Sequence, residues 1–205
     1  VDKILAEKLQ FFWIAICRAN LFDSENDLEL LRKTKAAGCL GFGYSLESAN
    51  KEIMRAMNKM LDLGSFARQK RLLDKAGLTS WTSLVFGYPQ ETKDTIKETM
   101  DLCYELDIYP SSGYLMPLPM TTLYTYIFEK GIVKDEEEYL LSLGDRQDLR
   151  LNLTKMSDAE FEGEIRKHLE RISEKLNLGL SGDQLIKTTN YKSIQTGGNK
   201  MIECH

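Results

Sequence analysis

Polar and charged side chains gather directly after the apolar runs of this sequence. These groups are Arg18 with Asn20, Ser45–Asn50, Gly87–Thr92 and Pro117–Pro119. If the runs are parallel strands, the groups share one edge of the sheet, where α/β proteins bind their ligands. Carboxylate, hydroxyl and basic groups beside glycine backbone suit a small polar ligand. Such a ligand would carry hydroxyls, a carboxylate and an aromatic base.

Each group also has a purely structural explanation. Glu47 would favour the dipole at the start of a helix near Asn50. Gly87 would serve a turn, and Glu91 would suit the N-terminus of the next helix. Pro117 would simply end a strand. The residues by themselves leave both interpretations open.

Cysteine and histidine do not form a reactive set in this sequence. The cysteines make no CxxC or other compact spacing and predict reduced thiols; they are Cys17, Cys39, Cys103 and Cys204. His168 lies in a helical pattern and His205 is the last residue, and neither has a catalytic neighbour in the sequence. We therefore predict no catalytic residue and no metal ligand within this chain.

The elements that position these groups are four apolar runs that alternate with helical segments. The runs cover 10–17, 40–46, 79–86 and 111–116, and the helical segments cover 27–37, 65–76 and 92–106. Gly38 and Gly77 end the first two helices, as glycine commonly does. Strands that alternate with helices predict an α/β fold of parallel βα units.

After the fourth run the pattern changes to helices alone. Short helices are predicted over 121–130 and 135–143, and a capping box at Ser157–Glu160 opens a long helix that ends near Leu176. The polar residues 178–205 predict an extended wrap or a partly disordered end. We therefore divide the chain into three parts. They are βα units over 1–130, a helical extension over 131–177 and a polar tail over 178–205.

Composition excludes few functions but disfavours two kinds of partner. The 205 residues are 42% hydrophobic and 28% charged, the net charge is -4, and basic residues are scattered among acids. Nucleic acid is therefore not a favoured partner. No apolar run is long enough to cross a bilayer and no leader opens the chain, so we expect a cytoplasmic protein.

Taken in order, these loops resemble the later half of the barrel of radical S-adenosylmethionine (SAM) enzymes. The likeness is to the branch that includes methylthiotransferases, oxygen-independent coproporphyrinogen oxidase-like proteins and cobalamin-binding members, and it covers about residues 9–145. The matching residues are Trp13, Arg18, Ala37–Cys39, Gly43–Ser48, Asn58–Lys59, Lys75–Leu78, Val85–Thr92 and Pro117–Tyr124.

The resemblance implies a (β/α)6 partial barrel, in which the four strands here would be the third to the sixth. It assigns the strand ends to SAM. The implied SAM-binding residues are Arg18, Glu47, Ser48, Lys59, Val85, Phe86, Gly87, Glu91, Leu115 and Pro117. Of these, Glu47 would meet the ribose or amino acid part of SAM and Lys59 its carboxylate. Residues 85–87 would border the adenine.

The family also uses a [4Fe-4S] cluster, held by a CxxxCxxC loop, that cleaves SAM reductively to a 5′-deoxyadenosyl radical. That loop and the glycine-rich motif expected after the second strand are absent from this sequence. Asn20, Gln90 and Met120 replace residues that are usual in the family. We therefore expect that this chain alone is inactive and contributes the SAM-binding wall of a longer enzyme. The first residue, Val1, agrees with that expectation.

A weaker likeness concerns a second cofactor. The stretch Glu136–Leu141, followed by Asn152–Thr154 and Met156–Ser157, resembles the sequence after the barrel in cobalamin-binding radical SAM proteins. It implies cobalamin in the longer protein, a small-molecule substrate, and methyl transfer or ring formation as the chemistry.

Four parallel strands leave two sheet edges with unpaired backbone groups. We expect the missing N-terminal part of the barrel to cover them, and the alternative is a dimer through an exposed edge. A rival interpretation is a non-catalytic βα scaffold that binds a partner through these edges. A third is a fragment of an unrelated TIM-type enzyme. A CxxxCxxC loop upstream would favour the enzyme over the scaffold.

Overall fold

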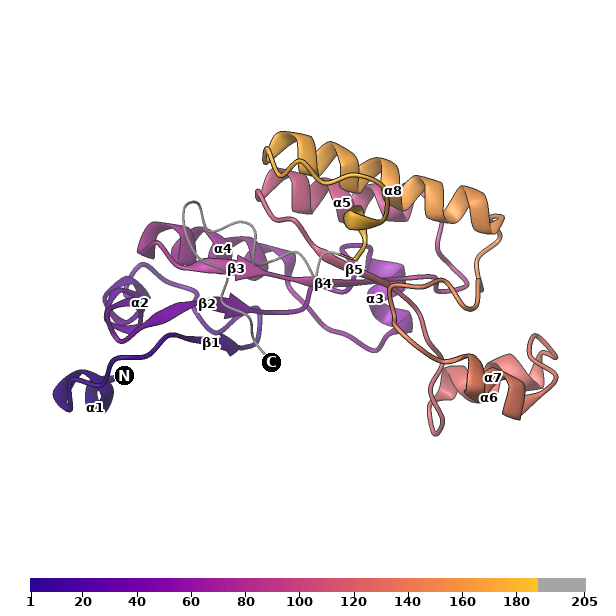
Figure 1. The fold of residues 1–205 in the computed structure, drawn as a ribbon, viewed down its shortest axis with the longest axis horizontal. Coiled ribbons are helices and arrows are strands. Elements are labelled where there is room, and N and C mark those ends of the chain that lie inside the picture. Colours follow the sequence, from indigo (N-terminus) through magenta and orange to yellow (C-terminus); the bar gives the residue numbers. More distant parts are fainter. Residues whose placement is uncertain (188–205) are drawn as a thin grey trace.

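The computed structural model describes residues 1–187 and shows parallel strands with helices packed against one face (Figure 1). The first elements are α1 Asp2–Ala6, β1 Trp13–Ile16, α2 Asp27–Ala36, β2 Cys39–Gly43, α3 Lys51–Ala56 and α4 Leu63–Ala76. They are followed by β3 Thr79–Trp81, β4 Ser83–Phe86, α5 Lys93–Glu105, β5 Ser111–Tyr114, α6 Thr122–Glu129, α7 Glu136–Ser142, α8 Asp158–Lys175 and the 3-10 turn η1 Gly182–Leu185. The predicted α/β class and parallel pairing are confirmed.

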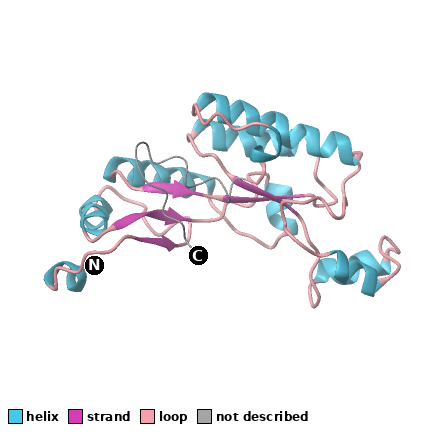
Figure 2. Cartoon of the chain, viewed as in Figure 1, coloured by secondary structure: helices cyan, strands magenta, loops and turns pink. Residues whose placement is uncertain are grey.

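The strands form two short parallel sheets. The segment that follows β2 connects them through hydrogen bonds to β4. β1, β2 and β3 lie in that order, and β4 pairs with β5. The Glu47 N–H donates to the Ser83 carbonyl at 2.9 Å, and the Val85 N–H donates to the Glu47 carbonyl at 3.0 Å. These bonds join the chain after β2 to β4, which continues beyond the end of β3 (Figure 2).

The strand predicted over 79–86 is in fact two strands, because it is interrupted at Thr82. This side chain is 1% exposed. Its hydroxyl donates to the Tyr44 carbonyl and accepts from the Leu46 N–H, each at 2.8 Å. The Thr82 hydroxyl therefore takes the place of backbone partners for the Tyr44 carbonyl and the Leu46 N–H. The regular backbone hydrogen bonding between the strands stops at this residue.

The two faces of the strands differ in burial. Phe42, Leu84 and Phe86 are 5%, 0% and 1% exposed and belong to the core beneath the helices. Ile14 and Ile16 on the outermost strand are 60% and 86% exposed. Successive side chains of a strand point to opposite faces, so one face is covered and the other is open.

Local signals account for the helix ends. The Asn50 side chain accepts from the backbone at the start of α3, and Asp62 does the same for α4. Thr92 begins α5 with a capping box. The predicted capping box at Ser157 is confirmed at the start of α8. Each cap satisfies N–H groups that have no partner within the helix.

The long helix α8, which lies in the predicted helical extension, packs against α5 and shares its core. The chain then returns as a wrap. Leu185 and Ile186 are 5% and 2% exposed, and the Tyr109 hydroxyl donates to the Leu185 carbonyl at 2.6 Å. The rest of the predicted tail, including Cys204 and His205, lies outside the described residues.

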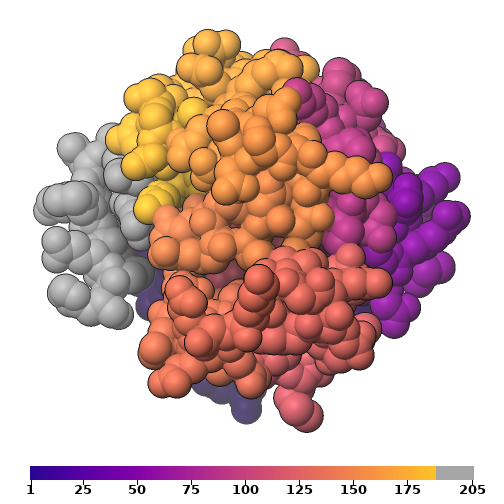
Figure 3. Space-filling view, turned by 90° about the vertical axis from the view of Figure 1, so that its right-hand side faces the viewer, coloured from indigo at the N-terminus to yellow at the C-terminus, as the bar shows by residue number. Residues whose placement is uncertain are grey.

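The helices α6 and α7 form a small lobe at the end of the molecule away from α1 (Figure 1) and beside α8 (Figure 3). Three aromatic rings hold the lobe together: Tyr124, Phe128 and Tyr139. The Tyr139 hydroxyl donates to the Pro117 carbonyl at 2.8 Å, which ties the lobe to the end of β5.

None of the helices within residues 1–187 is both long and apolar enough to cross a bilayer. Of the described cysteines, Cys17, Cys39 and Cys103 are free thiols.

Candidate functional site

Glu47 lies where the chain leaves the second strand, in a left-handed backbone conformation with φ of 64°. Such a conformation is costly for a residue other than glycine. Its N–H donates to the Ser83 carbonyl and its carbonyl accepts from the Val85 N–H, and these two bonds hold it in place. Its side chain is 24% exposed, so the carboxylate is fixed at the rim yet reachable from solvent.

Lys59 meets Glu47 at this rim. Its Nζ lies 3.5 Å from Glu47 Oε1 and donates to the Ser45 carbonyl at 2.9 Å. Arg18 and Asn20, after β1, line the same cavity of about 420 Å³ as Lys59. Arg18 and Lys59, two of the basic residues predicted to bind SAM, therefore line one cavity, and Lys59 lies beside the Glu47 carboxylate.

The turn after β4 is built around Gly87, whose φ is 119°. Its N–H donates to Glu91 Oε2 at 3.3 Å, and the Thr95 hydroxyl donates to the other carboxylate oxygen. Glu91 is 2% exposed. It supports the turn from the core side, and as a SAM contact Glu91 stays a prediction that rests on the resemblance.

Burial raises the pKa of Glu91 to about 7, against the opposing effect of the hydrogen bonds from Thr95 and Gly87. In the unfolded chain a glutamate side chain has a pKa of about 4.3. The folded chain therefore binds the extra proton between roughly pH 4 and pH 7, and stability falls as pH rises through that window.

We expect a Glu91→Gln variant to flatten this pH dependence, because its side chain carries no charge at any pH. Urea unfolding of both proteins between pH 4 and pH 8 checks it. The wild-type curve should fall with a slope approaching about 1.4 kcal/mol per pH unit relative to the variant. Glu105→Gln, at an exposed position of α5, is the matched control and should follow the wild type. Parallel curves for wild type and Glu91→Gln would contradict the assignment.

The other predicted contacts on β4 and β5 adjoin this turn. Val85 is half-buried, whereas the Phe86 side chain points into the core. The Leu115 N–H donates to the Phe86 carbonyl at 2.8 Å. A Cβ on Gly87 would lie 3.4 Å from Leu115 Cβ, so Gly87 and Leu115 are neighbours. Val85, Gly87 and Leu115 thus form one apolar side of the rim.

Two predicted residues serve the scaffold in this structure. The Ser48 side chain is 2% exposed, and its hydroxyl bonds to that of Thr99 at 3.3 Å. Pro117 is buried, and its carbonyl accepts from Tyr139. As ligand contacts, Ser48 and Pro117 stay predictions that rest on the resemblance.

Sequence reasoning missed Tyr88 at the same rim. Burial raises the pKa of this tyrosine, and the nearby charge of Glu47 raises it further. The Tyr88 hydroxyl is therefore held in its neutral, donating form beside the carboxylate.

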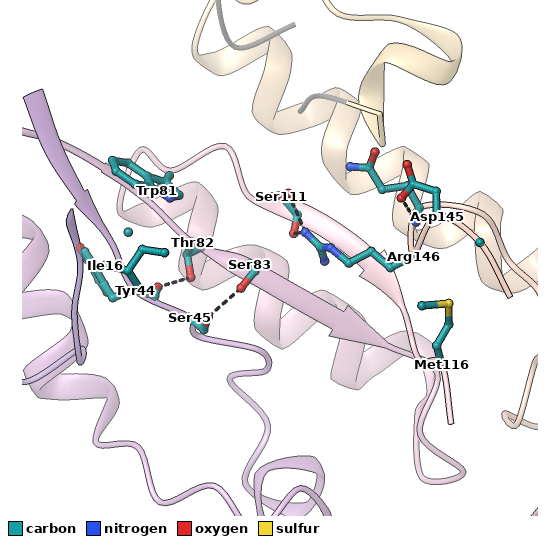
Figure 4. A pocket seen from close by; sticks show the side chains of 13 residues that line it. Ile16, Tyr44, Ser45, Trp81, Thr82, Ser83, Ser111, Met116, Asp145 and Arg146 are labelled. Carbon is teal, nitrogen blue, oxygen red and sulfur yellow. Dashed lines mark hydrogen bonds between the residues drawn. The ribbon is translucent and has the colours of Figure 1, made fainter. Parts of the chain in front are cut away.

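Sequence reasoning also missed a larger cavity, of about 660 Å³, on the open face of the strands (Figure 4). Ser45 and Ser83 bond to each other there at 2.8 Å. Arg146, from the loop after α7, reaches Ser111 Oγ at 2.8 Å. No local signal marks Arg146, since it lies in a polar loop far along the chain from these strands.

Comparisons with known proteins bear on the fold of the chain. No protein-family model matches the chain. A curated relative, an uncharacterized methyltransferase of Pyrococcus horikoshii, is 26% identical over 132 residues, which are 64% of this chain and 28% of the relative. Coproporphyrinogen III oxidase (HemN) from Escherichia coli, a radical SAM enzyme, has a TM-score of 0.54 at 17% identity, over 85% of this chain and 35% of that one. This chain shares its fold with part of radical SAM enzymes.

A second solved structure supports the same conclusion. The radical SAM methyltransferase TsrM from Kitasatospora setae, with cobalamin and a [4Fe-4S] cluster bound, has a TM-score of 0.50 at 21% identity, over 63% of this chain and 26% of TsrM. The radical SAM resemblance seen in the sequence is thus confirmed at the level of the fold. The chain spans about a quarter to a third of the length of these proteins.

Proposed function

We propose that this chain forms the SAM-binding wall of a radical SAM enzyme, as strands three to six of a (β/α)6 partial barrel. The observation that carries the proposal is the grouping at the strand ends. There the Glu47 carboxylate and the Lys59 ammonium lie 3.5 Å apart. A glycine turn at Gly87 and the apolar side chains of Val85 and Leu115 stand on the neighbouring strands.

The residues present fit the parts of SAM. The Glu47 carboxylate is a hydrogen-bond acceptor suited to ribose hydroxyls or to the ammonium group of the amino acid part. Lys59 and Arg18 are donors suited to the SAM carboxylate. Val85 and Leu115 offer an apolar surface for the adenine, and the glycine at position 87 permits the left-handed turn that joins them.

Bound SAM would supply the transferable methyl group and the radical chemistry of the family. The residues of this chain would orient it. Glu47, held by backbone bonds on both sides, fixes the sugar end, and Lys59 neutralises the carboxylate.

The described residues do not fit a [4Fe-4S] cluster. Among residues 1–187 no three histidine, cysteine, aspartate or glutamate side chains are grouped as metal ligands. We therefore assign no step of SAM cleavage to this chain and propose that it is inactive alone. For the longer protein we propose methyl transfer or ring formation on a small molecule, with cobalamin as a second cofactor. The names of the Pyrococcus relative and of TsrM support methyl transfer.

The outer edge of β1 fits a barrel that continues. β1 pairs with β2 alone among the described strands, and Ile14 and Ile16 expose apolar surface there. Long unprotected strand edges are uncommon in folded proteins. We propose that earlier strands of the same barrel cover this edge; a second copy of the chain is the alternative occupant.

The first test is a titration of the 205-residue chain with SAM, followed by amide NMR. We expect shifts at Glu47, Lys59, Val85 and Gly87. Glu47→Gln and Lys59→Met should each weaken binding about tenfold, a change equivalent to about 1.4 kcal/mol. Glu52→Gln, an exposed acid on α3, is the matched control and should bind as the wild type does.

Failure to see shifts at these residues with millimolar SAM would contradict the proposal. Equal affinities for the wild type and both rim variants would contradict the roles of Glu47 and Lys59. For the enzyme itself, anaerobic reconstitution of the longer protein with iron and sulfide should give a cluster and release of 5′-deoxyadenosine. Reconstitution without either signal would favour the non-catalytic scaffold.

A further inference from the structure

The cavity on the open face of the strands adjoins the rim cavity at Ile16 and Ser45, and its other end is polar and built around Arg146. The Arg146 guanidinium donates to Ser111 Oγ at 2.8 Å and lies 3.4 Å from the carbonyls of Ser111 and Leu84. The backbone around it is also fixed, because the Tyr114 N–H donates to the Arg146 carbonyl at 2.7 Å. The loop after α7 therefore runs beside β5 and delivers a cation onto the face of the sheet.

Glycine makes room for this arrangement. A Cβ at Gly113 would lie 2.5 Å from Arg146 Nη1 and 3.1 Å from Arg146 Cγ. The arginine side chain thus crosses β5 at a position that only glycine leaves open. This close fit indicates a built position for the guanidinium rather than a chance orientation.

Among residues 1–187, the partners of the Arg146 guanidinium are the hydroxyl and carbonyl oxygens of Ser111 and Leu84, and no carboxylate lies within 4.0 Å of it. The adjacent acid, Asp145, instead accepts from the Gln147 backbone N–H at 2.9 Å. Arginine presents a planar fork of donors that matches a carboxylate, and two or three hydroxyl or carbonyl contacts do not exhaust it.

The opposite end of the cavity is apolar and aromatic. Trp81 and Ile16 stand at that end, with the hydroxyls of Ser45 and Ser83 between them and Arg146 (Figure 4). Trp81 lies against Gly43, where a side chain would overlap its ring. A ligand that fits both ends has an anionic head and an apolar body.

We propose that this cavity binds a small organic acid, with Arg146 as the residue that recognises its carboxylate. One guanidinium, with Asp145 as its neighbour in the lining, matches a singly charged carboxylate better than a doubly charged phosphate. The identification of this cavity as the enzyme's substrate site rests on the proposed function. The binding of an organic acid in the cavity does not depend on that function.

The experiment is calorimetric titration of the 205-residue chain with octanoate, octanamide and octyl phosphate, without SAM. Octanoate should bind at least about tenfold more tightly than the neutral octanamide, and more tightly than octyl phosphate. Arg146→Gln should remove the preference for octanoate while leaving octanamide binding unchanged, which also shows that the cavity is intact. Arg150→Gln, an exposed arginine paired with Asp148, is the matched control and should keep the preference.

Ser111→Ala provides a second variant in case Arg146→Gln does not fold. It removes the hydrogen bond that orients the guanidinium and should weaken octanoate binding several-fold. Three outcomes would overturn the proposal: no octanoate binding at millimolar concentration, equal affinity for octanoate and octanamide, or tighter binding of octyl phosphate. None of these would alter SAM binding at Glu47 and Lys59, so the two proposals fail separately.

Discussion

Replacing Phe161 by alanine is expected to lower the free energy of unfolding by about 3–5 kcal/mol, the usual cost of removing a buried phenyl ring. Phe161 is 0% exposed on α8. It packs edge-to-face on Tyr114 of β5, with ring centroids 5.6 Å apart. Its Cζ would lie 3.5 Å from a Cβ on Gly87, so the ring also fills the space beneath the rim turn. The loss combines apolar burial, the aromatic contact and a cavity.

Urea unfolding followed by circular dichroism measures this difference. Phe12→Ala is the matched control, because Phe12 is 76% exposed and should cost less than about 0.5 kcal/mol. If Phe161→Ala lowered the free energy of unfolding no more than Phe12→Ala does, α8 and the strands would not share a core. In that case α8 would be a unit that folds separately from the strands.

Replacing Thr82 by valine is expected to cost about 2–4 kcal/mol, although the two side chains have nearly the same shape. The valine leaves the Tyr44 carbonyl and the Leu46 N–H without the partner that the Thr82 hydroxyl provides. Both groups lie in the buried part of the sheet, and each unsatisfied buried group costs about 1–3 kcal/mol.

Thermal and urea unfolding of Thr82→Val test this prediction. The matched control is Thr79→Val on β3, whose exposed hydroxyl makes a single bond, to the Leu40 carbonyl at 2.8 Å. That change should cost less than about 1 kcal/mol. Similar losses for the two variants would show that Thr82 does not hold the junction of β3 and β4.

The candidate SAM wall depends on parts of the chain that are far apart in sequence. The β4 turn at Gly87 rests on Glu91 from the same loop and on Phe161 from α8. Variants of Phe161 should therefore disturb the rim as well as overall stability. This support explains why a helix that follows the barrel strands belongs to the same core.

Sequence alone determined the order and type of the main elements. Helix caps such as Asn50 and Ser157 act within a few residues, and apolar periodicity marks the faces that must be buried. The same pattern placed Glu47 and Gly87 directly after strands, and the structure shows both at such positions.

Tertiary structure alone decided the features that depend on distant partners. Nothing local separates β3 from β4, because threonine is a good strand former and Thr82 interrupts the strand only through Tyr44 and Leu46. Glu91 reads in sequence as an acid near a helix start, yet burial sets its pKa and its supporting role. Arg146 reads as a loop residue, and only the pairing of its backbone with β5 places its charge on the open face. Burial and pairing between residues far apart in the chain are properties of the packed fold, so no local pattern records them.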